Sequence, residues 1–393
     1  MKKAILILLV SVFLLYMGYL TCMSFGYRET GQQETETEVK TEQSPQAQDE
    51  CINPSREKET VNWDDMLTVW LDGERQEICF RKGREIYIPV TAFHTKGEYG
   101  ISSEEIVLEL CGGTAVLYTK EDTAVIGNFE VPAACIYDGC WYVPGSVLEY
   151  AGYAVLEDPE FDQVFYTRIV HSREMSRSVR FPILNYHNID NNGDGIESLY
   201  VSPEDFERQM KYLKEEGYTF VTFDDFDRLD EIEKPVMITF DDGYRDNYVN
   251  AFPVLQKYNV KATVFIVAKS IDHKPRSMTS EMLWEMSQSG LVSVQSHTYT
   301  HGDLMSMSDS DMEKEMKLSR LVIARATGKI PYALAYPRGE TSEALVEHVN
   351  KTYEFAVLAN NRMFDPSGND VWHINRFGIY KTTTFEQFID LLG

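Results

Sequence analysis

The sequence predicts an α/β protein, in which a distorted barrel of about seven β/α units follows a small strand-rich α+β domain and an N-terminal membrane segment. From about residue 180 onward, short apolar runs alternate with amphipathic stretches of helical period. Before that point the apolar runs are shorter, alternate in polarity and stand close together between turn residues. The first residues form one long apolar run. These changes divide the chain into four segments, namely 1–25, 26–60, 61–170 and 178–393.

The segment 1–25 predicts the location of the protein. Lys2 and Lys3 precede an apolar run from Ala4 to about Leu20, which is long for a signal peptide and just adequate for a spanning helix. We expect a retained anchor, with a cleaved signal or lipidation at Cys22 as alternatives. All three place the rest of the chain outside the cytoplasm, in agreement with the positive-inside tendency. The expected location is therefore the cell surface, attached to the membrane, or secreted if the segment is cleaved.

The segment 26–60 predicts a flexible acidic linker, because it is rich in Glu, Gln and Thr and has almost no apolar residues to bury. It contributes to a net charge of −25, which argues against nucleic acid as a partner since phosphate binding needs clustered Lys and Arg. The chain as a whole is 43% hydrophobic, which is ample for packed cores in the remaining segments.

The segment 61–170 contains a weak internal repeat. Tyr87 and Pro89 match Tyr142 and Pro144 at a period of 55 residues, and each copy reads as a strand, a proline, a short helix and a glycine-containing turn. The segment resembles small repeat domains of bacterial surface proteins that are similar to the N-terminal domain of copper amine oxidases. That resemblance implies a spacer or a wall-contacting module and no amine oxidase activity. Cysteine spacing shows no CxxC pair, so neither cysteine-bound metal nor thiol catalysis is expected.

In the segment 178–393, alternating strands and helices imply parallel strands whose carboxyl ends share one edge of the sheet. The helical patterns are 202–217, where Ser202 and Asp205 suit a capped N-terminus, and 308–328, where Gly328 suits a C-terminal stop. Candidate catalytic or metal-binding residues directly follow four strand-like runs. These are Tyr186-His187, Asp241-Asp242-Gly243, the stretch SHTYTH at 296–301 and the stretch YPRG at 336–339.

The spacing of two histidines predicts a metal site. His297 and His301 are four residues apart, so on a helical turn both rings would face one ion, and Asp242 can supply a third, oxygen ligand. Two histidines and one carboxylate leave coordination positions open, which is typical of a catalytic ion rather than a structural one. We expect one divalent ion, with zinc as the first choice and cobalt, nickel or iron as alternatives.

Two adjacent carboxylates cannot both bind the ion, because successive strand side chains point to opposite faces and Gly243 turns the chain. We assign Asp242 to the metal and Asp241 to general-base work on the attacking water. The stretch TFDDF at 222–226 nearly repeats TFDDG at 239–243 but lacks the glycine. Asp224 and Asp225 are therefore predicted to be helix-cap carboxylates.

The motifs together resemble a known family. ITFDDGYRDNY, ATVFIV, SHTYTH and AYPRG, in this order and spacing, resemble the NodB-homology polysaccharide deacetylases of carbohydrate esterase family four. The resemblance implies metal-dependent removal of N-acetyl groups from an N-acetylglucosamine-containing cell-wall or exopolysaccharide. It also implies that Asp241 is the base and that Asp242, His297 and His301 bind the metal. The backbone amide of Arg338, where members carry tyrosine, would form the oxyanion hole.

The sequence departs from the family pattern at two positions. The arginine that orients the base and the general acid must therefore be other residues than in most members. Many members carry an arginine at the position of Ala335, so the arginine that orients the base must come from elsewhere, and Arg376 is our candidate. The C-terminal leucine-histidine motif of the general acid has no clean copy here. The opening PILNYHNID instead resembles the poly-N-acetylglucosamine deacetylase subgroup, which implies that His187 is the acid, with His373 as runner-up.

Two other functions remain open from the sequence. An O-acetyl esterase acting on a xylan-like glycan would use the same chemistry, and a comparison of ester with amide substrates would separate the two. A non-catalytic wall-binding protein would explain the linker and the strand-rich repeat. It would leave the intact Asp, His and His set without a purpose. The expected partners are an acetylated polysaccharide substrate and the membrane.

Overall fold

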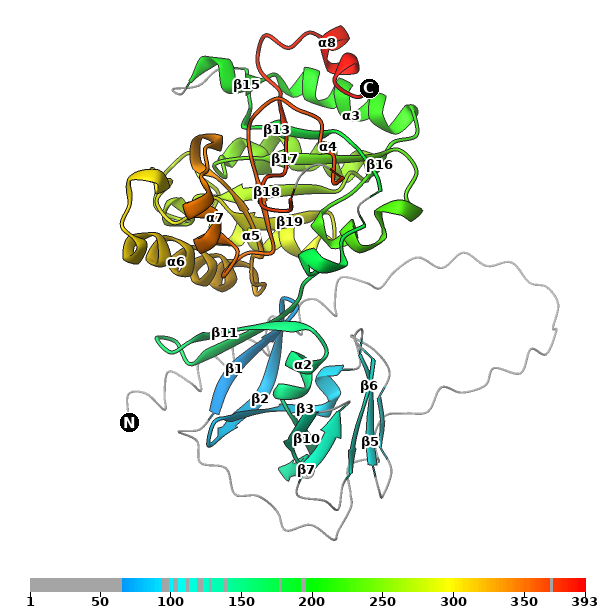
Figure 1. The fold of residues 1–393 in the computed structure, drawn as a ribbon, viewed down its shortest axis with the longest axis vertical. Helices are drawn as coiled ribbons and strands as arrows, with labels where there is room; N and C mark the ends of the chain where they lie inside the picture. The colour runs from blue at the N-terminus through cyan, green and yellow to red at the C-terminus, as the bar shows by residue number, and fades with distance from the viewer. Residues whose placement is uncertain are drawn as a thin grey trace, which may run out of the picture. The chain divides into compact units, whose positions relative to one another are not determined.

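The computed structural model describes residues 66–393 except 94–98, 102–104, 111–112, 119–122, 127–128, 138–139, 177, 192–195 and 368–369. The described part contains a strand-rich domain and a β/α domain (Figure 1), and each is treated by itself. The predicted membrane segment 1–25 and linker 26–60 lie outside the described residues. Among the helices that the structure describes, none combines the length and the apolar character needed to cross a membrane.

The strand-rich domain is organised around a seven-stranded sheet with the order β11-β12-β1-β2-β3-β10-β9. Its buried face is built from alternating apolar positions such as Val69 and Leu71, as expected for strands with one face against a core. The strands are β1 (Met66–Leu71), β2 (Glu74–Lys82), β3 (Glu85–Pro89), β9 (Cys135–Tyr137), β10 (Cys140–Pro144), β11 (Tyr153–Asp158) and β12 (Gln163–Arg168). The smaller elements are β4 (Tyr99–Ile101), β5 (Glu105–Leu110), β6 (Gly113–Tyr118), β7 (Thr123–Ile126), β8 (Phe129–Pro132) and helix α2 (Ser146–Tyr150).

The two copies of the sequence repeat pair with each other. Strands β3 and β10 are antiparallel, with Tyr87 opposite Pro144 and Pro89 opposite Tyr142. A short helical segment follows each strand, at Val90–Phe93 after the first copy and in α2 after the second. The weak repeat in the sequence thus corresponds to a pair of related structural units. The role of this domain as a spacer or wall contact stays a prediction.

The β/α domain is built on a parallel sheet that curls as a distorted β/α barrel would, and the predicted α/β fold is confirmed at this level (Figure 1). The strand order is β21-β20-β19-β18-β17-β13-β22, and β16 pairs with β17. Every residue of the central strand β17 is buried, which explains its continuous apolar sequence PVMITF. The strands are β13 (Ile183–Tyr186), β16 (Thr219–Phe220), β17 (Pro235–Phe240), β18 (Ala262–Ile266), β19 (Val292–Ser296), β20 (Ala333–Ala335), β21 (Phe355–Val357) and β22 (Phe377–Gly378), with the pair β14 (Asn188–Ile189) and β15 (Tyr200–Val201) beside them.

The two predicted helices begin and end where local signals predict. Ser202 Oγ accepts a hydrogen bond from the Asp205 N–H at 3.0 Å and caps the first helix, whereas Gly328 ends the longest one in a left-handed conformation with φ +70°. Buried apolar side chains on the inner faces of the helices pack against the strands. The helices are α3 (Pro203–Glu215), α4 (Phe252–Tyr258), α5 (Ser280–Gln288), α6 (Asp309–Thr327), α7 (Glu343–Val349) and α8 (Phe385–Asp390).

Asp225, in the near-copy TFDDF, is a structural carboxylate as predicted. It is 2% exposed, accepts a hydrogen bond from the Thr222 N–H at 3.0 Å as a helix cap, and pairs with Arg228 and with Lys261 at 3.0 Å. Burial raises its pKa, but the Thr222, Arg228 and Lys261 hydrogen bonds outweigh burial and hold the pKa of Asp225 below its ordinary value. The neighbouring Asp224 instead accepts a hydrogen bond from the Tyr332 hydroxyl.

We expect Asp225→Asn to lower the free energy of unfolding by about 2–3 kcal/mol at neutral pH, because the change removes the charge that the two cations partner in a buried position. Since the folded-state pKa of Asp225 lies below its unfolded value of about 3.9, the contribution is fully present above that value. It is lost as the pH falls through the folded-state pKa. Urea unfolding of both proteins at pH 7 and pH 3 measures this, and a difference that does not shrink at pH 3 would contradict it.

Candidate active site and metal centre

The residues predicted to carry chemistry meet at the carboxyl ends of neighbouring parallel strands. Asp241 and Asp242 directly follow β17, His297 directly follows β19, and His187 directly follows β13. Strands β13, β17, β18 and β19 pair in parallel and in register, so their last residues lie along one edge of the sheet. The site is therefore a direct consequence of where each apolar run ends.

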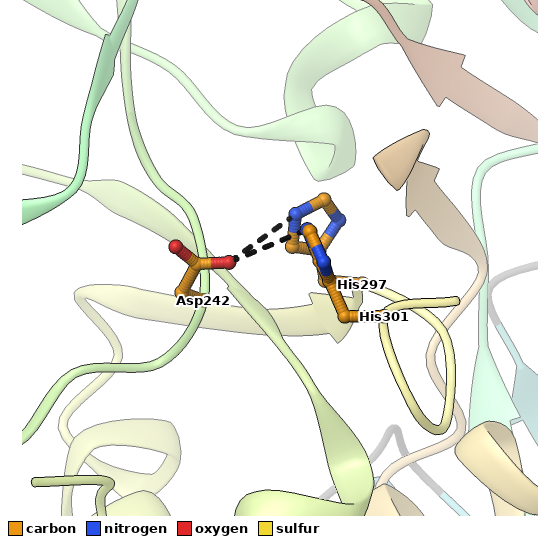
Figure 2. A group of neighbouring side chains, drawn as sticks. All are labelled: Asp242, His297 and His301. Atoms are coloured by element: carbon orange, nitrogen blue, oxygen red, sulfur yellow. Dashed lines mark ion pairs between the residues drawn. The ribbon is translucent and has the colours of Figure 1, made fainter. Parts of the chain in front are cut away.

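Asp242, His297 and His301 converge on one point from two different loops (Figure 2). Asp242 Oδ1 lies 3.6 Å from His297 Nε2 and 3.6 Å from His301 Nε2, and all three donor atoms lie within 4.8 Å of one another. Two imidazole nitrogens and one carboxylate oxygen at this separation fit a single divalent ion. Among the described residues, no second group of His, Cys, Asp or Glu forms such a cluster.

The two histidines are prepared to bind a metal. His297 Nδ1 lies 2.8 Å from the carbonyl oxygen of Ala335, which can only accept, so the ring proton is on Nδ1 and Nε2 carries the free lone pair. Burial, followed by the neighbouring His297, lowers the pKa of His301 and favours its neutral form. Metal binding needs unprotonated imidazole, so both effects favour the expected role.

Asp241 is not part of this cluster but is held beside it by Arg376. The carboxylate is 3% exposed, and the guanidinium donates from Nη1 to Oδ1 at 2.8 Å and from Nη2 to Oδ2 at 2.7 Å. Burial would raise the pKa of Asp241, but Arg376 outweighs burial and holds that pKa well below its usual range. Arg376 itself is fully buried, and also donates to the Leu358 carbonyl at 2.9 Å.

Three residues that the sequence analysis did not single out complete the surroundings of the carboxylates. Asn185 Nδ2 donates to Asp241 Oδ2 at 3.0 Å, and Thr239 Oγ1 accepts from Arg376 Nη1 at 3.1 Å. Burial and then the Asp242 carboxylate raise the pKa of Tyr244, so its hydroxyl lies within electrostatic reach of that carboxylate. A signal for the first two was present, because each is a polar residue inside an otherwise apolar strand at the end that carries the motif.

The backbone is strained where the motifs turn. Asp242, Thr298, His301 and Arg338 have φ values of +71°, +65°, +61° and +63°, a region that non-glycine residues rarely occupy. Gly243 has φ +73°, and an added Cβ would lie 2.8 Å from Ile266 Cδ1, so the third position of the DDG motif favours glycine. Such strain persists only where the surrounding structure holds it, as at a functional site.

Glu315 of helix α6 holds the loop that carries the two histidines. The carboxylate is buried and accepts from the N–H groups of Tyr299 and Thr300 at 3.1 and 2.8 Å and from the Thr300 hydroxyl at 2.8 Å. The prediction of a helical turn between His297 and His301 is wrong, because both lie in a non-helical loop in which Thr298 Oγ1 accepts from the His301 N–H at 3.1 Å. Three donors on one buried carboxylate hold the turn between the two histidines in its left-handed conformation.

We expect Glu315→Ala to weaken zinc binding about 10–100-fold, which is the usual range for a group that supports the metal ligands without touching the metal. Competition with a chromogenic chelator measures the affinity directly. The matched control is Glu313→Ala, which removes an exposed carboxylate of the same helix. Equal zinc affinity in the Glu315 and Glu313 variants would contradict this role.

His187 lies at the end of β13 with a half-buried ring. Burial lowers its pKa, and Asp241 and Asp242 oppose this effect, which places the ring within electrostatic reach of both carboxylates. Its Nδ1 is buried without a hydrogen-bond partner in the described part of the chain. The runner-up His373 has its Nδ1 paired with Asp370 at 2.8 Å.

Arg338 follows β20 in a turn (Pro337–Gly339) at the same edge of the sheet. Its side chain is 60% exposed, with Nη1 at 3.5 Å from Asp303 Oδ2. The cation adds to the effects that lower the pKa of His301, so Arg338 lies near the proposed metal position. The proposed oxyanion role belongs to its backbone N–H and stays a prediction.

The profile of the polysaccharide deacetylase family matches residues 228–355, which include the aspartate and histidine motifs. The chain thus carries the sequence pattern of the polysaccharide deacetylase family over about a third of its length. The predicted family is thereby confirmed.

Curated relatives agree with the match. YxkH of Bacillus subtilis, which is named for the same family, is 37% identical over 187 residues, or 46% of this chain and 65% of the relative. A poly-beta-1,6-N-acetyl-D-glucosamine N-deacetylase of Staphylococcus epidermidis is 28% identical over 186 residues, or 43% of this chain and 64% of the relative. The chain thus spans slightly less than two thirds of the length of these relatives.

Solved structures show the same fold. A polysaccharide deacetylase from Bacillus cereus, 28% identical, superposes with a TM-score of 0.52 over 78% of this chain and 81% of that structure. This coverage exceeds the share of residues 178–393, so the likeness extends into the strand-rich domain. A Streptococcus pyogenes deacetylase, PplD, solved in complex with acetate, is 27% identical with a TM-score of 0.51, over 55% of this chain and 99% of that structure.

Proposed function

We propose that the protein removes N-acetyl groups from an N-acetylglucosamine-containing cell-wall or exopolysaccharide, in a reaction that depends on a divalent metal. The observation that carries the proposal is the pairing of an Asp242–His297–His301 donor set with a separate carboxylate, Asp241, clamped by Arg376. The family match and the curated relatives named as N-acetyl-D-glucosamine deacetylases support the substrate class. Zinc is the ion that the donor set favours.

A divalent ion held by Asp242, His297 and His301 would polarise an acetamide carbonyl and lower the pKa of a water molecule to about 7. Asp241 is the base that receives a proton from the attacking water, and Arg376 and Asn185 keep its carboxylate oriented. The Arg338 N–H would stabilise the developing oxyanion. His187, at the end of the strand that pairs with the Asp241 strand, would give a proton to the departing amine.

Acetate release from a panel of acetylated glycans tests the proposal. The panel contains poly-N-acetylglucosamine, chitooligosaccharide, peptidoglycan and O-acetylated xylan, each supplied to the zinc-loaded full chain. We expect release from at least one N-acetylated polymer and little from the xylan. Release from xylan alone would replace the proposal by an O-acetyl esterase, and no release from any polymer would favour a wall-binding protein.

We also propose that the segment 1–25 anchors the protein in the membrane, so that the active site acts outside the cytoplasm. The support is the apolar run from Ala4 to about Leu20 behind two lysines. Extraction of the membrane fraction tests whether the protein is anchored. Protease treatment of intact cells tests whether the active site lies outside the cytoplasm. A protein found only in the cytoplasmic fraction would contradict the proposal.

A further inference from the structure

The strand end that carries His187 is tied to the segment that follows the DDG motif. The Tyr186 carbonyl accepts from the Asp241 N–H at 2.9 Å, and the His187 carbonyl accepts from Asn247 Nδ2 at 2.7 Å. Ile189 donates its N–H to Asp246 Oδ1 at 3.0 Å.

Two more contacts extend this set. Asn188 Nδ2 donates to Asp246 Oδ2 at 2.8 Å, and Asn250 Nδ2 donates to the Ile189 carbonyl at 2.7 Å. Four successive residues, 186–189, are therefore each hydrogen-bonded to residues between 241 and 250.

Asn247 is the member of this set that is closest to His187, and its orientation is determined by chemistry. The side chain is fully buried, and Nδ2 also donates to Asp246 Oδ1 at 3.0 Å. Turning the amide over would place its oxygen against the His187 carbonyl and the Asp246 carboxylate, so only the present orientation is favourable. In this orientation Asn247 Oδ1 has no partner among the described residues, an unfavourable arrangement that must be offset elsewhere.

The local helix geometry is also unusual. Asn247 begins a π-helical turn, Asn247–Ala251, between the DDG motif and α4. Such turns are rare, cost stability and occur frequently at functional sites. The π-helical turn and the unpartnered oxygen are both unfavourable. They occur at the residue that donates a hydrogen bond to the His187 carbonyl.

We infer that Asn247 is a positioning residue that fixes the backbone at His187 relative to Asp241 and Asp242, and so places the general acid at the departing amine. The inference rests on the proposed function. Asn247 touches neither the metal ligands nor the reacting atoms in the proposed scheme, and acts through the His187 carbonyl and the Asp246 carboxylate. Its loss should therefore impair the protonation of the leaving group and spare the metal site.

The test compares two leaving groups. An amine must be protonated as it departs, whereas 4-nitrophenolate leaves without a proton, so a misplaced acid slows acetamide hydrolysis and spares hydrolysis of 4-nitrophenyl acetate. The variants are Asn247→Ala, which removes the donor, and Asn247→Asp, which keeps the shape but places an oxygen against the His187 carbonyl. The control is Tyr248→Phe in the same turn, which removes only a hydroxyl paired with Glu285 at an exposed position.

For both Asn247 variants we expect kcat on chitooligosaccharide to fall about 10–100-fold, with KM, zinc affinity and the ester rate within about twofold of wild type. The double variant with Asn247→Ala and His187→Ala should hydrolyse the acetamide substrate with the same kcat as His187→Ala alone. Both changes impair the same function, which is the protonation of the leaving amine. The Tyr248 control should match wild type throughout.

Equal falls in the amide and ester rates, a loss of zinc affinity, or additive effects of the Asn247 and His187 changes would overturn the inference. Either Asn247 variant decides the outcome if the other fails to fold. A wild-type protein that releases no acetate from any acetamide is a different result, which contradicts the proposed function itself.

Discussion

Asp241→Asn is expected to lower kcat for acetate release about 10²–10⁴-fold, the range that a positioned general base contributes. Asparagine keeps the size of the side chain but cannot accept the proton of the attacking water. The zinc affinity should change little, because Asp242 and not Asp241 belongs to the donor cluster. Steady-state kinetics with zinc-loaded protein measures the first effect, and chelator competition measures the second.

The same substitution also leaves Arg376 buried opposite a neutral partner, and we expect a fall of about 3 kcal/mol in the free energy of unfolding. The matched control is Asp225→Asn, because Asp225 is also a buried aspartate with cationic partners in the near-copy of the motif. That control should lose stability and keep its kcat. Full activity in the Asp241 variant, or an equal loss of kcat in the Asp225 variant, would contradict the assignment of the base.

His301→Ala is expected to weaken zinc binding more than 100-fold, because loss of a metal ligand exceeds the 10–100-fold cost of losing a supporting group. Activity at limiting zinc should disappear in parallel. The matched control is His273→Ala, which removes an exposed histidine outside the cluster. Isothermal titration of zinc into both variants distinguishes them, and unchanged affinity in the His301 variant would exclude the proposed ligand set.

The location of the site could be predicted from the sequence because its residues end apolar runs. Asp241, Asp242 and His297 directly follow β17 and β19, and parallel strands bring their ends to one edge whatever the details of the connections. The repeat around Tyr87 and Tyr142 could also be predicted, because two related strands have similar local sequences. That the two copies pair with each other, as antiparallel strands β3 and β10, could be seen only in the structure.

The support around the site was harder to predict, because it comes from tertiary contacts. Arg376 reaches Asp241 because β22 pairs with β13. No local feature of the sequence predicts that strand pairing. The sequence points to Arg376 only through the missing arginine at Ala335 and through its place at a late strand. Glu315 lies in a charged stretch, although its spacing from Met312 and Ser319 puts it on the buried face of α6.

The contacts of Asp246 and Asn247 could not be predicted for a further reason. Nothing local in the stretch YRDNY predicts a π-helical turn, and Asn247 is buried in that turn. The choice between His187 and His373 as general acid likewise depended on a family resemblance. The structure adds that His187 lies on the strand beside Asp241, whereas the ring of His373 pairs with Asp370.

Titration of zinc into metal-free protein, with acetate release from poly-N-acetylglucosamine and bound metal both recorded, tests the central claim most directly. The account predicts that activity and metal content rise together and saturate at one ion per chain. His301→Ala should abolish both changes over the same range of zinc concentration. Full acetate release by protein shown by elemental analysis to lack metal would contradict the account.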